Sequence, residues 1–467
     1  MPNPIPNLEA AMLTPPPEII TLLAIFADAM SAPTFAKALV LLFGTILASG
    51  PRTVAAALRA MGYTEAVNFG KYHRVLNRDK WSLWVTARLL LRLLIASFIP
   101  PGVAIVFFVD ETLGRRNGPK IVYKGLFRDS VRSTARRVVT SWGIRWCVVC
   151  LRAPVPWSGR YWALPFLIVP VLSEKTCARL KKPHRSGVEW AILLIRRIRE
   201  WLPDREIILV GDGGYAAIGL IRTCQRLNVT LVARLRLDAA VYAFPGPQPK
   251  SKRGPKPKKG KRQASFPARL ADPATVWETA ELRWYRGEAK QVELATGVSL
   301  WRQPNSDPVP IRWVLIRYEE ENERTKKRTI KTGVLLCSSP SASPVEIVEW
   351  FVSRWNIEVT FEEIRAHLGF ETQREWSKQA LRRTTPCLFG VFSLVVLMAK
   401  ALHPERLPVQ QSAWYEKEDA TFSDALAAVR MALWNGMNNI DSAESGETCA
   451  IPRALWDHVQ RIVCYAP

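Results

Sequence analysis

The sequence has little of what zinc and redox sites are made of. Its five histidines lie far apart, and its eight cysteines are scattered over 467 residues. Cys147 and Cys150 form a C-x-x-C pair inside an apolar run that is typical of a strand, with no second pair or histidine cluster nearby. Structural zinc sites are built from four cysteine or histidine ligands at short spacings. The pattern therefore favours buried core thiols over a metal or redox centre.

Long apolar runs without charges are also missing. A membrane span needs about 20 apolar residues with few charges. The stretch 84–100 is interrupted by Arg88 and Arg92, and the stretch 387–399 has the length of a buried core helix. The first ten residues lack the basic start and apolar centre of a signal peptide. We expect no membrane partner and a cytoplasmic protein, in a cell without a nucleus.

Acidic residues are scarce relative to basic ones. The chain has 65 Lys and Arg residues against 41 Asp and Glu residues, which gives a net charge of +24 and a pI near 10.0. A surface this basic attracts polyanions, and DNA or RNA is the usual partner. A generally basic soluble protein, or one that binds anionic membranes, is the alternative. The 48% of apolar residues is enough for a sizeable core and excludes a disordered chain.

The N-terminal part of the chain is predicted to be helical and basic. Helix formers dominate from Ile19 to Ile95, with apolar residues at helical spacing. Two interpretations stay open: a DNA-binding domain with some helix-turn-helix character, or a basic helical cap packed on the core. The basic residues of this block are Arg52, Arg59, Lys71, Arg74, Arg78 and Lys80.

The central part of the chain has the element order of an RNase H-like fold. Val103–Val109 is an apolar, partly β-branched run that ends in Asp110 and is typical of a buried strand. Further apolar stretches predict, in order, strands at 138–151 and 162–172, a helix at 187–201, a strand at 207–210, a helix at 216–227 and a strand at 229–233.

A basic, β-rich insertion interrupts this order. Residues 250–262 hold eight basic residues in thirteen and no acid, and their prolines and glycines prevent a packed element. The segment is either an arm that clamps DNA phosphates or an exposed linker. Alternating apolar residues predict strands over 275–335. The candidate phosphate contacts are Lys250, Lys252, Arg253, Lys256, Lys258, Lys259, Lys261 and Arg262.

The predicted fold class is therefore α/β, with five regions. They are a helical N-terminal DNA-binding domain at 1–100, the first part of an RNase H-like core at 101–236, a β-rich insertion at 237–332, the second part of the core at 333–400 and a helical C-terminal region at 401–467. A helix is expected from Pro344 to about His367, with Ser343 and Glu346 forming a capping box.

Carboxylates at the ends of the core strands predict a metal site. Asp110 follows the first strand, and Asp212 follows the fourth strand in a Gly-rich turn. The first and fourth strands are neighbours in an RNase H-like sheet, so both acids can face one site. Mg²⁺ or Mn²⁺ prefers such oxygen ligands, and two ions about 4 Å apart suit phosphodiester cleavage. An ordinary strand-terminal Asp and an Asp-Gly turn are the alternatives.

The third metal ligand is expected on the helix after the insertion. Phe351, Arg354, Glu358 and Arg365 are spaced by 3, 4 and 7, so they share one helical face. Glu358 is the first choice because two arginines that can hold phosphates flank it, and a surface ion pair with Arg354 is the alternative. Glu362 is the second choice, and the competing acids are Glu349 and Glu363.

These motifs resemble the DDE transposases of bacterial insertion sequences, and most closely the hairpin-forming branch with a Tyr–Arg–Glu–Lys signature. Phe351, Arg354, Glu358 and Arg365 stand at the signature positions, and the contexts of Asp110 and Asp212 fit as well. Phe351 replaces the tyrosine and lacks its hydroxyl contact with a phosphate. Arg365 replaces the lysine, which keeps the charge but changes the geometry.

The resemblance implies cut-and-paste transposition through hairpin ends, with Asp110, Asp212 and Glu358 as catalytic metal ligands for two Mg²⁺ or Mn²⁺ ions. It implies double-stranded DNA partners, namely terminal inverted repeats and target DNA, and a homodimer in the DNA complex. It also implies an insertion-domain tryptophan that stacks on an extruded base. Trp301 and Trp313 are the candidates, with a core position as the alternative for each.

Two other functions remain open. One is a domesticated transposase that binds DNA but no longer cuts it, and the other is an RNase H-fold nuclease without strand transfer. The presence of the three acids favours an active transposase, which is the function predicted from the sequence.

Overall fold

The computed structural model describes residues 14–134, 136–246, 256–321, 326–414, 416–437 and 453–466. The chain divides into two compact units. Unit 1 comprises Met1–Pro100, Glu111–His184 and Glu358–Pro467, and unit 2 comprises Pro101–Asp110 and Arg185–Ile357. Strand β1 (Ile105–Arg115) and helix α11 (Asn356–His367) contribute residues to both units.

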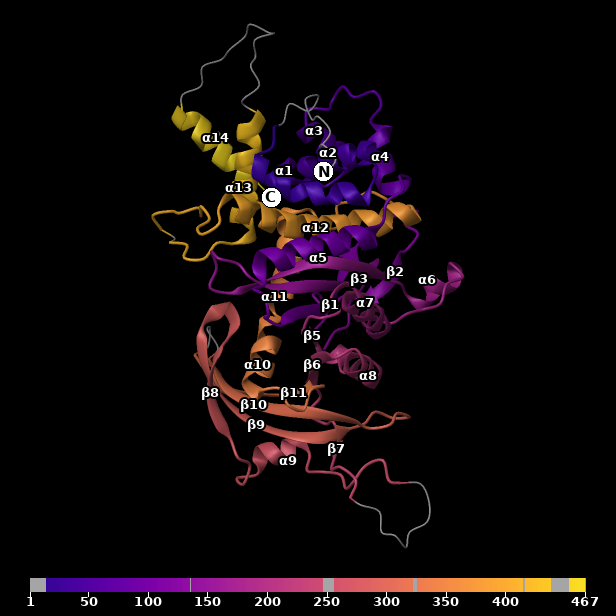
Figure 1. The fold of residues 1–467 in the computed structure, drawn as a ribbon, viewed down its shortest axis with the longest axis vertical. Coiled ribbons are helices and arrows are strands. Elements are labelled where there is room, and N and C mark those ends of the chain that lie inside the picture. Colours follow the sequence, from indigo (N-terminus) through magenta and orange to yellow (C-terminus); the bar gives the residue numbers. More distant parts are fainter. Residues whose placement is uncertain are drawn as a thin grey trace. The chain divides into compact units, whose positions relative to one another are not determined.

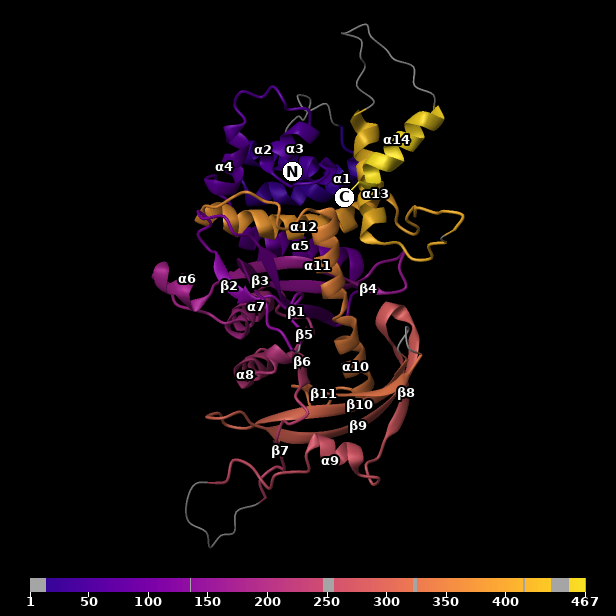
Figure 2. The same cartoon turned by 180° about the vertical axis from the view of Figure 1, so that it is seen from behind.

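Unit 1 contains most of the helices. They are α1 (Pro17–Ala24), the 3₁₀ helix η2 (Ile25–Ala29), α2 (Ala32–Leu47), α3 (Val54–Ala60), α4 (Gly70–Asn77), α5 (Leu83–Phe98), α6 (Glu174–Arg179), α12 (Lys378–Leu402), α13 (Phe422–Met437) and α14 (Arg453–Tyr465). Figures 1 and 2 both show α12 between α5 and the N-terminal helices α1–α4.

Helix α12 organises the core of unit 1. The side chain of Ser377 caps its first turn by accepting from the amide of Ala380. Its hydropathy and its length of 25 residues would suffice for crossing a membrane, but 67% of its most apolar window is buried inside the protein. It packs on α1, α4, α5 and α13 and on strand β4 (Tyr161–Val171). Burial of this kind is expected of a core helix.

The strands of unit 1 are antiparallel. Strand β2 (Gly125–Arg128) pairs with β3 (Thr140–Pro154), which pairs with β4 along most of its length. Strand β3 also neighbours β1. The three strands β1, β3 and β4 therefore lie in the order expected for the first half of an RNase H-like core. Cys147 and Cys150 are fully buried on β3, so the prediction that they are core thiols is confirmed.

Unit 2 begins with the parallel strands of the core. The first part of β1 pairs with β5 (Ile207–Gly211), and β5 pairs with β6 (Val229–Leu235), both in parallel. The crossover helices are α7 (Gly187–Trp201) and α8 (Ile218–Arg226). Ser186 and Glu189 form a capping box at the start of α7. The predicted adjacency of the first and fourth core strands is confirmed.

The rest of unit 2 is an antiparallel sheet with one helix on each face. Its elements are β7 (Val241–Tyr242), α9 (Phe266–Ala271), β8 (Glu278–Arg283), the 3₁₀ helix η4 (Tyr285–Gly287), β9 (Ala289–Trp301), β10 (Val309–Glu321), β11 (Arg328–Cys337) and α10 (Pro344–Ser353). Figures 1 and 2 show α9 and α10 on opposite sides of this sheet. Strand β11 joins the sheet to β6 by antiparallel pairing.

The α/β class, with a β-rich insertion and helices toward both ends of the chain, is confirmed. The expectation of one helix from Pro344 to His367 is wrong. Helix α10 ends at Ser353 and α11 begins at Asn356. The capping box is absent too, since Ser343 makes no side-chain cap bond. Arg354 lies between the two helices.

The close packing of α2 on α3 yields a test of the fold. A Cβ added at Gly44 would lie 2.3 Å from the carbonyl oxygen of Ala57, which is backbone and has no room to move. We expect Gly44→Ala to lower the free energy of unfolding by about 1–3 kcal/mol through overpacking. The measurement is urea unfolding followed by circular dichroism.

Gly390 in α12 is the matched control. A Cβ there meets Leu90 at 3.7 Å, an ordinary contact. Because alanine is a better helix former than glycine by about 1 kcal/mol, Gly390→Ala should keep or raise stability. Equal effects of the two substitutions would contradict the packing described for α2 and α3.

Candidate active site

Two aspartates lie at or directly after paired positions of neighbouring parallel strands in unit 2. Asp110 lies inside β1, which continues to Arg115, so the expectation that it ends the first strand is wrong, whereas Asp212 directly follows β5. Val109 on β1 is paired with Gly211 on β5, and Asp110 and Asp212 are the residues that directly follow this pair in the sequence. Neighbouring strands lie about 4.8 Å apart, so the two residues come close at one edge of the sheet. The strands are buried up to this point, while both acids are only partly covered. Asp110 and Asp212 therefore come from adjacent positions, as the predicted order of the core strands implied, and their joint role as metal ligands stays a prediction.

The Gly-rich turn fixes the orientation of Asp212. Its Oδ1 accepts a hydrogen bond of 2.8 Å from the amide of Gly214, so the acid caps the 3₁₀ helix η3 (Gly213–Tyr215). A Cβ at Gly211 would lie 2.7 Å from the buried side chain of Tyr215. Only glycine fits at this position. The Asp-Gly turn that the sequence offered as an alternative is therefore present, and it holds Asp212 directly after β5.

Asp110 is paired with an arginine 244 positions away along the chain. The Nη1 atom of Arg354 donates to Oδ2 of Asp110 over 2.6 Å, and the two side chains are 11% and 17% exposed. The guanidinium of Arg354 also lies over the Phe351 ring, 5.7 Å from its centroid. The sequence suggested phosphates or Glu358 as the partner of Arg354. The structure shows Asp110 on the first strand as a partner of Arg354.

The acids near α11 differ in their surroundings. Within unit 2, Glu349 accepts from the amide of Arg283 at 3.4 Å. Within unit 1, Glu363 lies 3.2 Å from the ring nitrogen of His367, and Glu362 is exposed. Glu358 is half-buried in the first turn of α11. This comparison favours Glu358, whose role as the third ligand stays a prediction.

The donor set at the strand ends suits a hard divalent cation. Carboxylate oxygens are the ligands that Mg²⁺ and Mn²⁺ prefer, and Asp110 and Asp212 supply them from two rigid strands. Within the described ranges, however, no group of three His, Cys, Asp or Glu side chains is gathered closely enough to hold a metal ion.

Arg365 is bound to neighbouring residues of unit 1, and its contact with a phosphate stays a prediction. It donates to the Thr112 hydroxyl at 2.6 Å, to the Leu113 carbonyl at 3.2 Å and to the Phe361 carbonyl at 3.1 Å. Its Nε lies 3.5 Å from Glu371. Burial lowers the pKa of this guanidinium, against the opposing effect of Glu371. Arg365 therefore fastens α11 to the end of β1.

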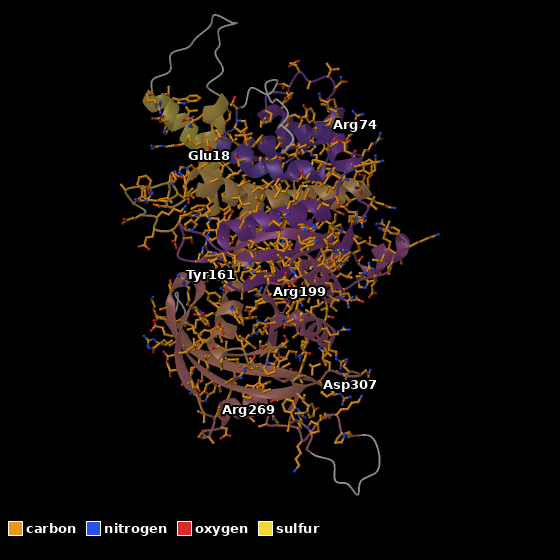
Figure 3. The ribbon with its side chains drawn as sticks, in the orientation of Figure 1. Glu18, Arg74, Tyr161, Arg199, Arg269 and Asp307 are labelled. Atoms are coloured by element: carbon orange, nitrogen blue, oxygen red, sulfur yellow. The ribbon has the colours of Figure 1, made fainter. Side chains whose placement is uncertain are left out.

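Trp301 and Trp313 lie in the core of unit 2, so neither can stack on an extruded base in this arrangement. They are 5% and 4% exposed. The Trp313 ring is covered by the Arg269 guanidinium at 4.7 Å from its centroid, and its Nε1 donates to Ser299 at 3.0 Å. Figure 3 labels Arg269 on α9. This burial agrees with the other interpretation of the two tryptophans, which placed them in the core.

The basic loop is only partly a solvated arm. Lys250, Lys252 and Arg253 lie outside the described residues. The described part, 256–262, runs along β7, where the amide of Ala243 donates to the Lys261 carbonyl at 2.9 Å. Other contacts of this part are Lys258 with Asp307 at 2.5 Å, Lys259 over the Tyr242 ring at 3.6 Å and a β-bridge between Arg262 and Tyr242. Lys256, Lys258, Lys261 and Arg262 remain exposed to solvent.

The N-terminal helices fit both of their sequence interpretations. Arg59, Lys71, Arg74, Arg78 and Lys80 are exposed, and Figure 3 labels Arg74 on α4. Helix α4 also packs on α2 and α12, as a cap would. Arg52 is the exception among the basic residues of the block. It is 5% exposed and donates to the carbonyls of Thr45, Gly50 and His367.

Comparison with known proteins adds the family. A profile of the DDE superfamily endonucleases matches residues 26–298, which include both strand-end aspartates but not Glu358. Among solved structures, the chain is similar to a piggyBac transposase in a synaptic complex with hairpin DNA, with a TM-score of 0.40 and 10% identity over 96% of this chain and 87% of that one. No curated protein sequence matches. Because the profile covers more than half of its length, the chain belongs to the DDE superfamily endonucleases.

Proposed function

We propose that the protein is a DNA transposase that cuts and joins DNA with Asp110, Asp212 and Glu358 as its catalytic acids. The observation that carries this proposal is the adjacency of Asp110 and Asp212, each of which comes directly after the last parallel pair of β1 and β5, Val109 with Gly211. The family match supports phosphodiester cleavage, and the net charge of +24 supports a nucleic-acid substrate.

Asp110 and Asp212 would hold a pair of Mg²⁺ or Mn²⁺ ions, with Glu358 as the third ligand. Such ions supply activation of the attacking oxygen and stabilisation of the leaving oxygen. Asp212 is held by the amide of Gly214, so its carboxylate is oriented in advance. Arg354, which donates to Asp110, would have to release this carboxylate before it could serve as a metal ligand. The released guanidinium would supply positive charge near the site.

The finer steps belong to the same proposal. We infer cut-and-paste movement of an insertion sequence through hairpin ends, by a homodimer on terminal inverted repeats, in the cytoplasm of a bacterial cell. The resemblance around Arg354 and Glu358 supports these steps. Phe351 stands where the signature has tyrosine, so the hairpin step would proceed without that hydroxyl.

One observation favours a second function. Asp110 is neutralised by Arg354, and within the described ranges no three-residue metal cluster is assembled. A protein that binds DNA without cutting it would keep its aspartate paired in this way. The two functions differ in whether the purified protein excises an element from a plasmid.

The acids provide the first test of this proposal. Asp110→Asn, Asp212→Asn and Glu358→Gln should each reduce Mg²⁺-dependent plasmid excision by at least about 100-fold, because each removes a charged ligand from transition-state stabilisation. DNA affinity should be retained. Asp204→Asn, at an exposed site of unit 2, is the control with the same change in charge.

The outcomes separate the candidates. Normal excision by Glu358→Gln would show that the third ligand is another residue, such as Glu362. Normal excision by all three variants would refute the proposed site. A wild-type protein that binds DNA but never cuts it would establish the second function.

Arg354 provides a test that does not depend on cleavage. Removing its charge with Arg354→Gln should raise the affinity for Mn²⁺, since the cation no longer competes for Asp110. A roughly tenfold gain corresponds to about 1.4 kcal/mol. The measurement is titration calorimetry or electron paramagnetic resonance of Mn²⁺. Arg354→Lys, which keeps the charge, should gain less. Unchanged Mn²⁺ affinity of Arg354→Gln would contradict the competition.

A further inference from the structure

The hairpin of β2 and β3 in unit 1 is strongly basic and takes no part in the site described above. Between Lys120 and Arg145 the sequence has seven basic residues and one acid, Asp129. The two strands are paired from Gly125 with Gly143 to Arg128 with Thr140, so residues 129–139 form the connecting loop. The exposed arginines of the hairpin are Arg128, Arg132, Arg136 and Arg137.

The only acid of the hairpin is withdrawn from its surface. Asp129 is 1% exposed and accepts two bonds from Arg115, at 2.7 and 3.0 Å, and one from the Ser141 hydroxyl at 2.9 Å. These bonds, the Arg115 bonds above all, hold the pKa of Asp129 well below its usual range. Asp129 therefore stays ionised and internally neutralised. What the hairpin presents to solvent is almost entirely positive charge.

Hydrogen bonds within the loop hold the described parts of its backbone, 129–134 and 136–139. The amide of Asp129 donates to the Val139 carbonyl at 2.9 Å, and the Ser133 hydroxyl accepts from the Val139 amide at 3.0 Å. At the tip, the amide of Thr134 donates to the Arg137 carbonyl at 2.9 Å, and the Thr134 hydroxyl accepts from the Arg137 amide at 3.1 Å. Arginines on a fixed backbone lose less conformational entropy on binding than those on a flexible tail.

One face of the hairpin also exposes a large apolar pair. Leu126 and Trp142 are cross-strand partners and are 50% and 46% exposed. Lys124 lies over the Trp142 ring, 5.1 Å from its centroid. Arg128 is two residues beyond Leu126, so it projects from the same face. An aromatic ring among cations is a common feature of nucleic-acid surfaces, where apolar side chains contact the sugars between phosphates.

We propose that the β2–β3 hairpin is a DNA-binding element that grips the phosphate backbone of duplex DNA. This inference rests on the proposed function, because it takes DNA as the substrate. Arginine forks match phosphate oxygens well, and contacts with phosphates carry no sequence information. The hairpin therefore adds affinity without choosing the site.

The salt dependence of DNA binding tests the proposal. The full-length protein binds a duplex in Ca²⁺ or EDTA, where cleavage is suppressed, and affinity is measured by fluorescence anisotropy from 50 to about 300 mM salt. The logarithm of the association constant falls linearly with the logarithm of the salt concentration, and each lost phosphate contact makes this negative slope shallower by about 0.9. The double variant Arg136→Gln/Arg137→Gln should therefore have a slope that is shallower by about 1.8. It should also bind the duplex roughly tenfold more weakly than the wild-type protein at 100 mM salt.

Two further variants control this measurement. Arg453→Gln/Arg461→Gln on α14 removes the same charge from exposed positions of the same unit and should change the slope much less. Arg128→Gln/Arg132→Gln repeats the test at the base of the loop. Melting temperatures of all variants show whether the fold persists. Arg136 and Arg137 are exposed, whereas Arg132 also pairs with Asp129 at 3.8 Å and Arg453 with Asp457 at 3.0 Å, so only a small loss is expected for the variants at these two positions.

Each outcome bears on the inference. Equal slopes for the hairpin variants and the α14 control would overturn it, even if the wild-type protein binds and cuts DNA. A loss confined to one of two unrelated duplex sequences would overturn the backbone role. Tighter binding of the full-length protein to double-stranded RNA or to an acidic peptide than to duplex DNA would overturn the choice of DNA as the partner of the hairpin. A wild-type protein without DNA affinity would refute the proposed function itself.

Discussion

Parallel pairing of β1 with β5 is the constraint on which the candidate site depends. Parallel neighbours run in register and end at the same edge, so two residues that follow paired positions must come out side by side. Here these residues are Asp110 and Asp212, which are a hundred positions apart in sequence. The buried apolar strands behind them cannot slip by one residue without turning their side chains to the wrong face. The hydrophobic core therefore fixes the position of the acids.

Part of the positive charge of the protein is buried, because several arginines lie in its core. Arg430 is 1% exposed and donates to the carbonyls of Ile46, Ala48, Cys464 and Ala466. Arg52 and Arg383 are also buried and bind backbone carbonyls. Desolvation lowers the pKa of Arg430 and of Arg52 to about 10, so both stay charged at neutral pH. These arginines serve as internal clamps, and the basic surface consists of the others.

The sequence was sufficient for the features that follow from local pattern. Apolar runs that end in an acid predicted the strands before Asp110 and Asp212, and their order predicted the adjacency of the two. The insertion was evident from alternating apolar residues. These properties depend on periodicity and on the fixed geometry of parallel sheets, both of which are visible in one chain.

Features that depend on distant partners were not predictable. Nothing near Arg354 indicates that the helix breaks there and that its charge reaches Asp110. Trp313 shares one face of β10 with the buried Val309 and Ile311, so the core position that its sequence context favoured is confirmed. The contact of its ring with α9 was not predictable. Arg365 was expected to face DNA because its helical face is shared with Glu358. Its partners on β1, Thr112 and Leu113, come from the opposite end of the sequence.

The position of α12 in the chain has a consequence for biosynthesis. This helix has a mean hydropathy of 1.9 over its most apolar window, a value that a translocation machinery would accept as a membrane anchor. Its partners α1, α2, α4, α5 and β4 all precede it, and among its main contacts only α13 follows. When α12 leaves the ribosome, the surfaces that bury it already exist. In a circular permutant that begins with α12, the helix would be synthesised before the elements that bury it, which would favour aggregation or insertion into a membrane.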